Sequence, residues 1–257
     1  MRRYFKYIIL IALLSPSIVF ADQSARPKDV NLSNFQFGPI NRWSFSHLRE
    51  VLPTVNIEHS DGNSLKLKKN KKYTENFNLD YDAQTQSINE IAEKRYIDGI
   101  IILKNDEILF EQYYGNLTED KPHLMNSISK SVVGLLAGKL EQDGLIDFDK
   151  PVSYYVPELS KSGWGPDLLR LVLDMKDGSD YSEDYPDFTT TFRIQDCAIG
   201  WTDADYCPEK IENGLYNFLP TIGRKESNIG TFKYRSGSTD VIGWVLEKAS
   251  GKPLANL

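Results

Sequence analysis

The sequence has very few of the side chains that usually hold metal ions. Among its 257 residues are only two cysteines, Cys197 and Cys207, and three histidines, His47, His59 and His123. Cysteine and histidine are the usual ligands of zinc. This scarcity speaks against a zinc site, and we expect the protein to need neither a metal nor an organic cofactor.

Positive charge and long apolar runs are also scarce. The formal net charge is −6, and it becomes about −9 if an N-terminal leader with three basic residues is removed. An acidic chain is poorly suited to bind nucleic acid, which we exclude as a partner. Beyond the N-terminus no apolar run is long enough to span a bilayer. Internal repeats, coiled-coil heptads and low-complexity tracts are absent from the sequence.

The N-terminus has the pattern of a secretory signal peptide. Basic residues in Met1–Lys6 precede an apolar run from Tyr7 to Leu14 and a small-residue cleavage site at Val19–Ala21. We predict that residues 1–21 are removed after Ala21, which makes the protein periplasmic or secreted, with no stable membrane span. An uncleaved N-terminal anchor is the alternative, although the apolar run is short for a span.

In an oxidising compartment Cys197 and Cys207 can close a short loop as a disulfide; two unpaired thiols are the alternative. The mature chain of about 235 residues is long enough for one domain with a sizeable core. Residues 22–95 are polar and mixed, with a basic cluster at 66–72, and we interpret them as an accessory N-terminal extension outside the chemistry. Residues 96–257 form the predicted domain.

Two apolar runs, Gly99–Leu103 and Ile108–Phe110, flank an Asn-Asp turn and predict a β-hairpin. Further along, Pro166–Leu173 reads as a helix with proline in its first turn. An amphipathic helix is predicted up to Gly251, with Ser238, Thr239 or Asp240 as its N-cap. Tyr234 would then lie on a loop just before that helix.

The most informative motif is Ser127-Ile128-Ser129-Lys130, an S-x-x-K sequence. On a helix, positions i and i+3 share a face about 5–6 Å apart, so the Lys130 amine can reach the Ser127 hydroxyl, as an activated serine nucleophile requires. Alone the motif is weak, since it leaves open Ser127 as an N-cap and Lys130 as a solvated lysine. The context favours a helix, because apolar residues recur at helical spacing until Gly144: Val132, Val133, Leu135, Leu136, Ala137 and Leu140.

Together these motifs resemble the class C β-lactamase-like serine hydrolases, and within them the 6-aminohexanoate-dimer hydrolase branch. The resemblance covers roughly residues 38–254 and is carried by Asn126–Ser131, Leu173–Met175 with Tyr181–Tyr185, Phe232–Ser236, Thr239–Trp244, and Asn41–Phe45 with His47 and Arg49-Glu50. It implies an α+β fold of the β-lactamase/transpeptidase type, in which helices flank an antiparallel sheet, a helical subdomain is inserted, and the nucleophile helix lies at their junction.

The resemblance implies that Ser127 is acylated, that Lys130 helps to take its proton, and that Tyr234 bridges nucleophile and leaving group. A tyrosine is a poor base unless a nearby ammonium stabilises its anion, so we also predict a contact between Lys130 and Tyr234. Tyr185 matches a tyrosine that contacts the substrate amide. Ser236, also placed in the substrate site, stands where β-lactamases have Asn, which favours the amidase and esterase branch.

The sequence ends at Leu257, and the family's third motif, a K-T-G or H-x-G strand, has no counterpart in it. We therefore expect an incomplete domain over 96–257, with an unpaired edge and an uncovered apolar surface at the hairpin. Losing one oxyanion donor of that strand would cost about 10²–10³ in rate.

The leading hypothesis is a secreted serine hydrolase that cleaves a small amide or ester. A β-lactamase or D-Ala-D-Ala peptidase is one alternative, and a truncated, non-catalytic remnant or binding protein is another. A nucleophile-elbow lipase is disfavoured because the sequence contains no G-x-S-x-G.

Overall fold

The computed structural model describes residues 27–57, 62, 66–70, 77–81, 83–210 and 213–257. The predicted signal peptide, residues 1–21, and the end of the basic cluster, Lys71-Lys72, lie outside the described residues. The α-helices are α1 Asn41–Ser44, α2 Ile88–Lys94, α3 Ser129–Gln142, α4 Val152–Tyr155, α5 Leu169–Leu173, α6 Thr191–Ala198, α7 Leu215–Phe218 and α8 Ser236–Ser250. The strands are β1 Lys68–Lys69, β2 Asn78–Tyr81, β3 Gln84–Ser87, β4 Gly99–Lys104 and β5 Glu107–Tyr113.

The predicted hairpin is confirmed. Strands β4 and β5 pair in antiparallel register, with Asn105 and Asp106 both at positive φ in the turn between them. Positive φ at both central residues is the requirement of a tight hairpin turn, and Asn and Asp tolerate it well. The sequence did not predict that β1 pairs with β5 in parallel, through Lys68 and Lys69. The sheet order is β1-β5-β4.

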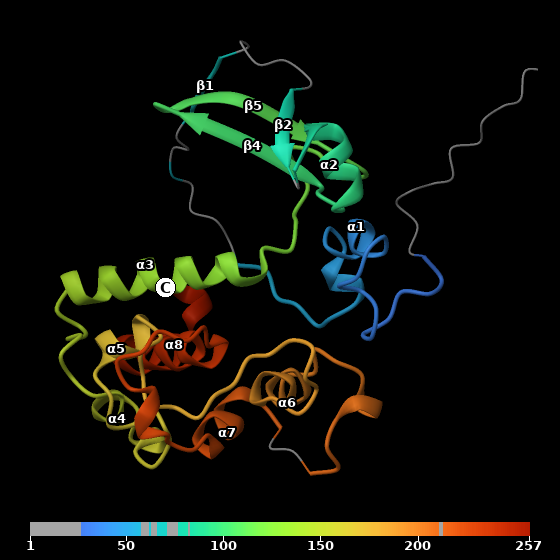
Figure 1. Cartoon of the computed structure of the whole chain (residues 1–257). Helices are drawn as coiled ribbons and strands as arrows, with labels where there is room; N and C mark the ends of the chain where they lie inside the picture. Colours follow the sequence, from blue (N-terminus) through green and yellow to red (C-terminus); the bar gives the residue numbers. More distant parts are fainter. Residues whose placement is uncertain (1–26, 58–61, 63–65, 71–76, 82, 211–212) are drawn as a thin grey trace, which may run out of the picture.

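The nucleophile helix begins slightly later than its motif. Residues Asn126–Ile128 form a 3₁₀ turn that leads directly into α3 at Ser129. At its other end α3 finishes at Gln142, and Gly144 adopts φ +73°, the left-handed conformation that terminates a helix. Figure 1 shows α3 between the sheet above it and helices α4, α5 and α8 below it.

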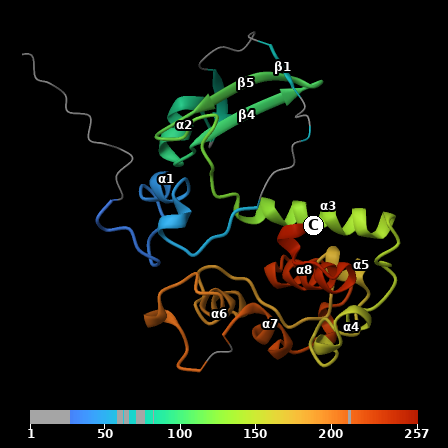
Figure 2. The ribbon, with the colours of Figure 1, turned by 180° about the vertical axis from the view of Figure 1, so that it is seen from behind.

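Most of the buried apolar side chains lie in what we call the helical body, formed by α3 to α8. Helix α8 is central to it, because Val241, Val245 and Leu246 on α8 are fully buried. Helix α3 contributes Ala137 and Leu140 to the same cluster. Figure 2 shows from behind that α8 lies beneath α3 and beside α5.

Two predicted helix starts were wrong. Helix α8 begins at Ser236, so Ser238, Thr239 and Asp240 lie inside it and none of them is its N-cap. Its first turn is capped from elsewhere in the chain, because the Ser236 amide donates to the Glu183 carboxylate, and the local sequence does not reveal this contact. Helix α5 begins at Leu169, which leaves Pro166 in the preceding turn outside the helix. The predicted end of α8 is confirmed, since Gly251 has φ +69°.

The described residues between 27 and 95 form short elements with a small core. Val30, Phe35, Trp43 and Leu52 are buried together. Helix α2 starts with a capping box, in which the Ser87 hydroxyl accepts from the Glu90 amide and the Glu90 carboxylate accepts from the Ser87 amide.

A cluster around Asp98 joins the N-terminal segments to the chain that leads into the motif. This buried carboxylate lies 3.5 Å from the Arg42 guanidinium and 3.0 Å from His123 Nε2. In addition, the Leu124 amide donates to the Phe45 carbonyl. The N-terminal region is therefore held against the segment just before Ser127.

The hairpin and the neighbouring face of α3 expose apolar side chains. On β4, Ile101 and Leu103 are 52% and 51% exposed, and on α3 Val132 and Leu135 are 57% and 75% exposed. Among the described residues β4 pairs with β5 alone. This is the unpaired edge and uncovered apolar surface that the sequence led us to expect.

Candidate functional site

The S-x-x-K motif folds into the arrangement that its spacing predicts. Lys130 Nζ donates to Ser127 Oγ over 2.8 Å. Asn126, directly before the serine, has φ +45°, a left-handed conformation that Asn adopts more readily than most residues. Strained backbone of this kind is common beside reactive groups. Its effect here is to turn the chain sharply just before Ser127.

Ser127 and Lys130 open into a cavity of about 840 Å³. The cavity lies between α3, the segment 183–206 and the first turns of α8, and residues 32–37 of the N-terminal region form part of its wall. The N-terminal region is therefore more than the accessory segment expected from its composition. A volume of this size is within the usual range of small-molecule binding sites.

Tyr234 lies beside Lys130 with its ring face, and not its hydroxyl, in contact with the ammonium. The Lys130 ammonium is 5.4 Å from the centre of the Tyr234 ring, which is a cation–π contact. Tyr234 lines a second hollow, of about 450 Å³, next to the main cavity. Lys130 and Tyr234 are thus in contact through the ring face, and the stabilisation of a Tyr234 anion by the ammonium stays a prediction.

Met175 fixes the loop that carries Tyr234. Its carbonyl accepts from the Lys233 amide and from Arg235 Nη1, both over 3.1 Å, and its sulfur accepts from the Arg235 amide. Met175 itself has φ +53°. Residues on both sides of Tyr234 are therefore attached to one backbone position.

A buried polar network holds Arg235, the residue after Tyr234. Arg235 and Asp177 are both completely buried and lie 3.8 Å apart. The Ser238 hydroxyl donates to Asp177 over 2.7 Å, and the Trp164 indole donates to Ser238. Buried charges need such partners, because water cannot reach them.

Glu183 connects the two predicted substrate-binding residues. Its carboxylate accepts from the Tyr185 hydroxyl over 2.8 Å and from the Ser236 hydroxyl over 2.9 Å. It also accepts from the Ser236 amide over 2.7 Å, which satisfies a free N–H at the start of α8. Glu183 lies within the Tyr181–Tyr185 stretch, but its role was not predicted, because the contact spans more than fifty residues.

Two further carboxylates line the cavity and were missed in the sequence. Burial raises the pKa of Asp196 to about 6, although Arg193, 3.6 Å away, opposes the shift. Burial likewise raises the pKa of Asp240 to about 6, against the hydrogen bond from Gln195 and the attraction of Lys130. Isolated Asp residues give no sequence signal, and only the fold brings these two to the same cavity.

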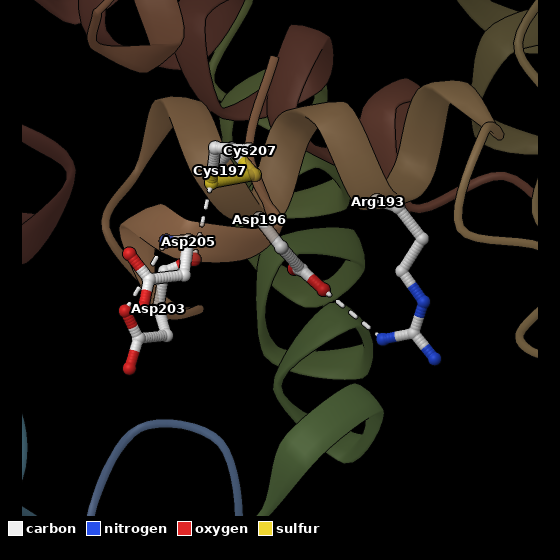
Figure 3. The surroundings of a disulfide bond; sticks show 6 residues. All are labelled: Arg193, Asp196, Cys197, Asp203, Asp205 and Cys207. Atoms are coloured by element: carbon white, nitrogen blue, oxygen red, sulfur yellow. Dashed lines mark hydrogen bonds and ion pairs between the residues drawn. A yellow bond between two sulfur atoms is a disulfide. The ribbon is translucent and has the colours of Figure 1, made fainter. Parts of the chain in front are cut away.

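The structure joins Cys197 and Cys207 in a disulfide. Cys197 is on α6 directly after Asp196, and the bond closes the loop that leads to Tyr206 and Cys207. Figure 3 shows the disulfide above the Asp196 side chain, which reaches toward Arg193. The loop contributes Ile199, Trp201, Thr202 and Tyr206 to the cavity wall.

The described part of the chain contains no group of three or more His, Cys, Asp and Glu side chains arranged to hold a metal ion. Among the same residues, no helix combines the length and the apolar character needed to cross a bilayer.

Comparison with known proteins gives a family match and two related proteins. The family described as Beta-lactamase matches residues 88–257. The 6-aminohexanoate-dimer hydrolase of Paenarthrobacter ureafaciens is 35% identical over 223 residues, which are 86% of this chain and 54% of that protein. The chain therefore spans about half the length of this curated relative.

A solved structure from Bacillus anthracis, assigned as a 6-aminohexanoate-dimer hydrolase, superposes with a TM-score of 0.78. It is 21% identical in sequence, and the match covers 90% of this chain and 61% of that one. The superposition confirms the α+β fold of the β-lactamase/transpeptidase type expected from the motifs. With the family match over most of its length and the serine–lysine pair in an open cavity, the chain belongs to the beta-lactamase family.

Proposed function

We propose that this protein is a serine hydrolase that cleaves amide or ester bonds through an acyl-enzyme on Ser127. The observation that carries the proposal is the 2.8 Å hydrogen bond between Lys130 Nζ and Ser127 Oγ at the wall of an open cavity. The family match supports the same chemistry.

In the proposed reaction the unprotonated Lys130 amine takes the proton of the Ser127 hydroxyl as Oγ bonds to the substrate carbonyl carbon. The C–N or C–O bond then breaks. The leaving group receives that proton from Lys130. Tyr234, whose ring centre is 5.4 Å from the Lys130 ammonium, stabilises the positive charge that Lys130 carries in between. In the second half water attacks the acyl carbon and gives a proton to Lys130. Lys130 returns that proton to Ser127 Oγ as the C–Oγ bond breaks, which releases the acid and restores the Ser127 hydroxyl.

Tyr185 and Ser236 are the proposed substrate-binding groups. Both already donate to Glu183, which holds them at fixed positions in the structure. A substrate amide N–H can donate to the Tyr185 oxygen while the Tyr185 hydroxyl still donates to Glu183. The named activity of the Paenarthrobacter relative makes 6-aminohexanoate dimer the first substrate to test.

The test is labelling by a fluorophosphonate, followed by turnover assays on the dimer, p-nitrophenyl esters and nitrocefin. We expect Ser127→Ala to abolish labelling and Lys130→Met to slow it by about 10²–10⁴-fold. Ser131→Ala is the matched control, because Ser131 is an exposed serine on α3, next to Lys130 and outside the cavity. Labelling that persists in Ser127→Ala would overturn the proposal.

The same assays separate the alternatives. Turnover of nitrocefin in place of the dimer and esters would favour a β-lactamase. Stoichiometric labelling without any turnover would favour a binding protein that keeps an acylable serine.

We also propose that the protein is exported and that residues 1–21 are removed. The basic and apolar pattern of the N-terminus supports this, as does the disulfide, which persists in oxidising compartments. Intact mass and N-terminal sequencing of protein from its native cells test the proposal. A retained Met1 would contradict it.

A further inference from the structure

Exposed aromatic rings gather at the mouth of the main cavity. Phe37, Phe188 and Tyr206 are 65%, 65% and 62% exposed, and all three line the cavity that contains Ser127. They come from three separate parts of the chain: the N-terminal region, the loop before α6, and the disulfide loop. Single exposed apolar residues are ordinary, but several around one cavity indicate a binding surface.

Two of the three rings, Phe188 and Tyr206, are in contact with each other and still accessible. Phe188 stacks on Tyr206 with ring centres 6.4 Å apart and planes inclined by 28°. Tyr206 belongs to a short 3₁₀ turn, Ala204–Tyr206, directly before the disulfide at Cys207. The bond therefore keeps Tyr206 close to α6 even though its side chain is exposed.

The nearest cation is already engaged. The Arg193 guanidinium lies 5.1 Å from the centre of the Phe188 ring, pairs with Asp196 and donates to the Tyr185 carbonyl. It has little capacity left for a substrate anion. Among the described residues that line the cavity, Phe37, Phe188 and Tyr206 are the most exposed of the large apolar side chains.

We propose that Phe37, Phe188 and Tyr206 form a subsite for an apolar group, an aryl ring or a medium-length alkyl chain, of the amide or ester that reacts at Ser127. The inference rests on the proposed function and adds a substrate class to it. The cavity of about 840 Å³ is much larger than a short amide needs. The subsite and the nucleophile share that one cavity, so a single substrate can occupy both.

Binding to the Ser127→Ala variant of the full chain tests the subsite without requiring turnover. The probes are butyramide, 4-phenylbutyramide and 4-aminobutyramide, measured by calorimetry. We expect the phenyl compound to bind about tenfold more tightly than butyramide, as one aromatic contact provides. Adding Tyr206→Ala or Phe188→Ala should remove that advantage, and Tyr206→Phe should keep it.

Tyr154→Ala is the matched control, because Tyr154 is an equally exposed tyrosine on α4 outside the cavity. It should leave the preference for the phenyl compound unchanged. A preference that survives both Tyr206→Ala and Phe188→Ala overturns the subsite. So does an advantage for 4-aminobutyramide that depends on Tyr206, since a cation would then be the ligand.

The hydrolase proposal is judged separately, by fluorophosphonate labelling of Ser127. If labelling fails and the phenyl preference still depends on Tyr206, the hydrolase proposal falls and the apolar subsite stands. If labelling succeeds and acyl chain length has no effect on p-nitrophenyl ester turnover in either the parent chain or Tyr206→Ala, the subsite falls and the hydrolase stands.

Discussion

The helical body and the three-stranded sheet bury apolar side chains to very different extents. In the helical body Leu246 is fully buried, whereas Leu103 on β4 is 51% exposed. Lys130 lies on α3, and Ser127 lies in the 3₁₀ turn directly before it. Helix α3 contributes residues to the core of the helical body and also exposes an apolar face. The candidate site therefore lies on the helical body, the part of the described structure that buries most of its apolar side chains.

The largest effect is expected from the buried charge in the helical body. Asp177→Ala leaves Arg235 buried without its ion-pair partner and Ser238 without its acceptor. Removing one partner of a buried pair costs about 3–5 kcal/mol. Urea denaturation should show this loss, and Asp149→Ala, which removes a carboxylate from an exposed ion pair with Arg170, is its control. A loss below about 1 kcal/mol would mean that the network contributes little.

A matched pair of substitutions compares the two regions directly. Leu246→Ala should lower the free energy of unfolding by about 3 kcal/mol, because it creates a cavity in a closed core. Leu103→Ala should change it by less than about 0.5 kcal/mol, because the side chain is already half in water. Thermal and urea unfolding measure both. Equal losses would show that β4 is covered in solution.

Within the helical body, the loop between Cys197 and Cys207 is held by a disulfide. The Cys197–Cys207 bond closes a loop with a sequence separation of 10. Loop-closure entropy gives it a contribution of about 2.5 kcal/mol. A Cys197→Ser/Cys207→Ser double variant should lose that stability, and dithiothreitol should have the same effect on the parent chain only. Unchanged melting temperatures under reduction would contradict the prediction.

The smallest predicted effect is the dependence of the free energy of unfolding on pH. The folded-state pKa of Asp196 is raised from 3.8 to about 6, so the folded protein holds this proton more tightly than the unfolded chain does. The resulting stability is fully present below pH 3.8 and is lost as pH rises through 6. Between pH 4 and 7 the parent chain should lose about 2 kcal/mol relative to Asp196→Asn. Urea titrations at both pH values measure the difference, and parallel curves would contradict it.

Local features were predictable from the sequence, and contacts between distant segments were not. The hairpin followed from an Asn-Asp turn between two apolar runs, and the Ser127–Lys130 contact followed from helical spacing. The start of α8 was misplaced because its first turn is satisfied by Glu183, more than fifty residues earlier. Phe37 was missed for a similar reason, since its place at the cavity depends on how the N-terminal region packs.

The left-handed conformation of Asn126 restricts which residues can occupy the position before the serine. Glycine and aspartate adopt φ +45° readily, whereas valine, isoleucine and threonine do so only with strain. We therefore compare all substitutions at position 126 for folding and for the 2.8 Å Lys130–Ser127 contact. Variants with Asn, Gly or Asp should keep both, and variants with β-branched residues should not. Asn126 also lines the cavity beside Ser127, so its backbone conformation limits which side chains can form this part of the cavity wall.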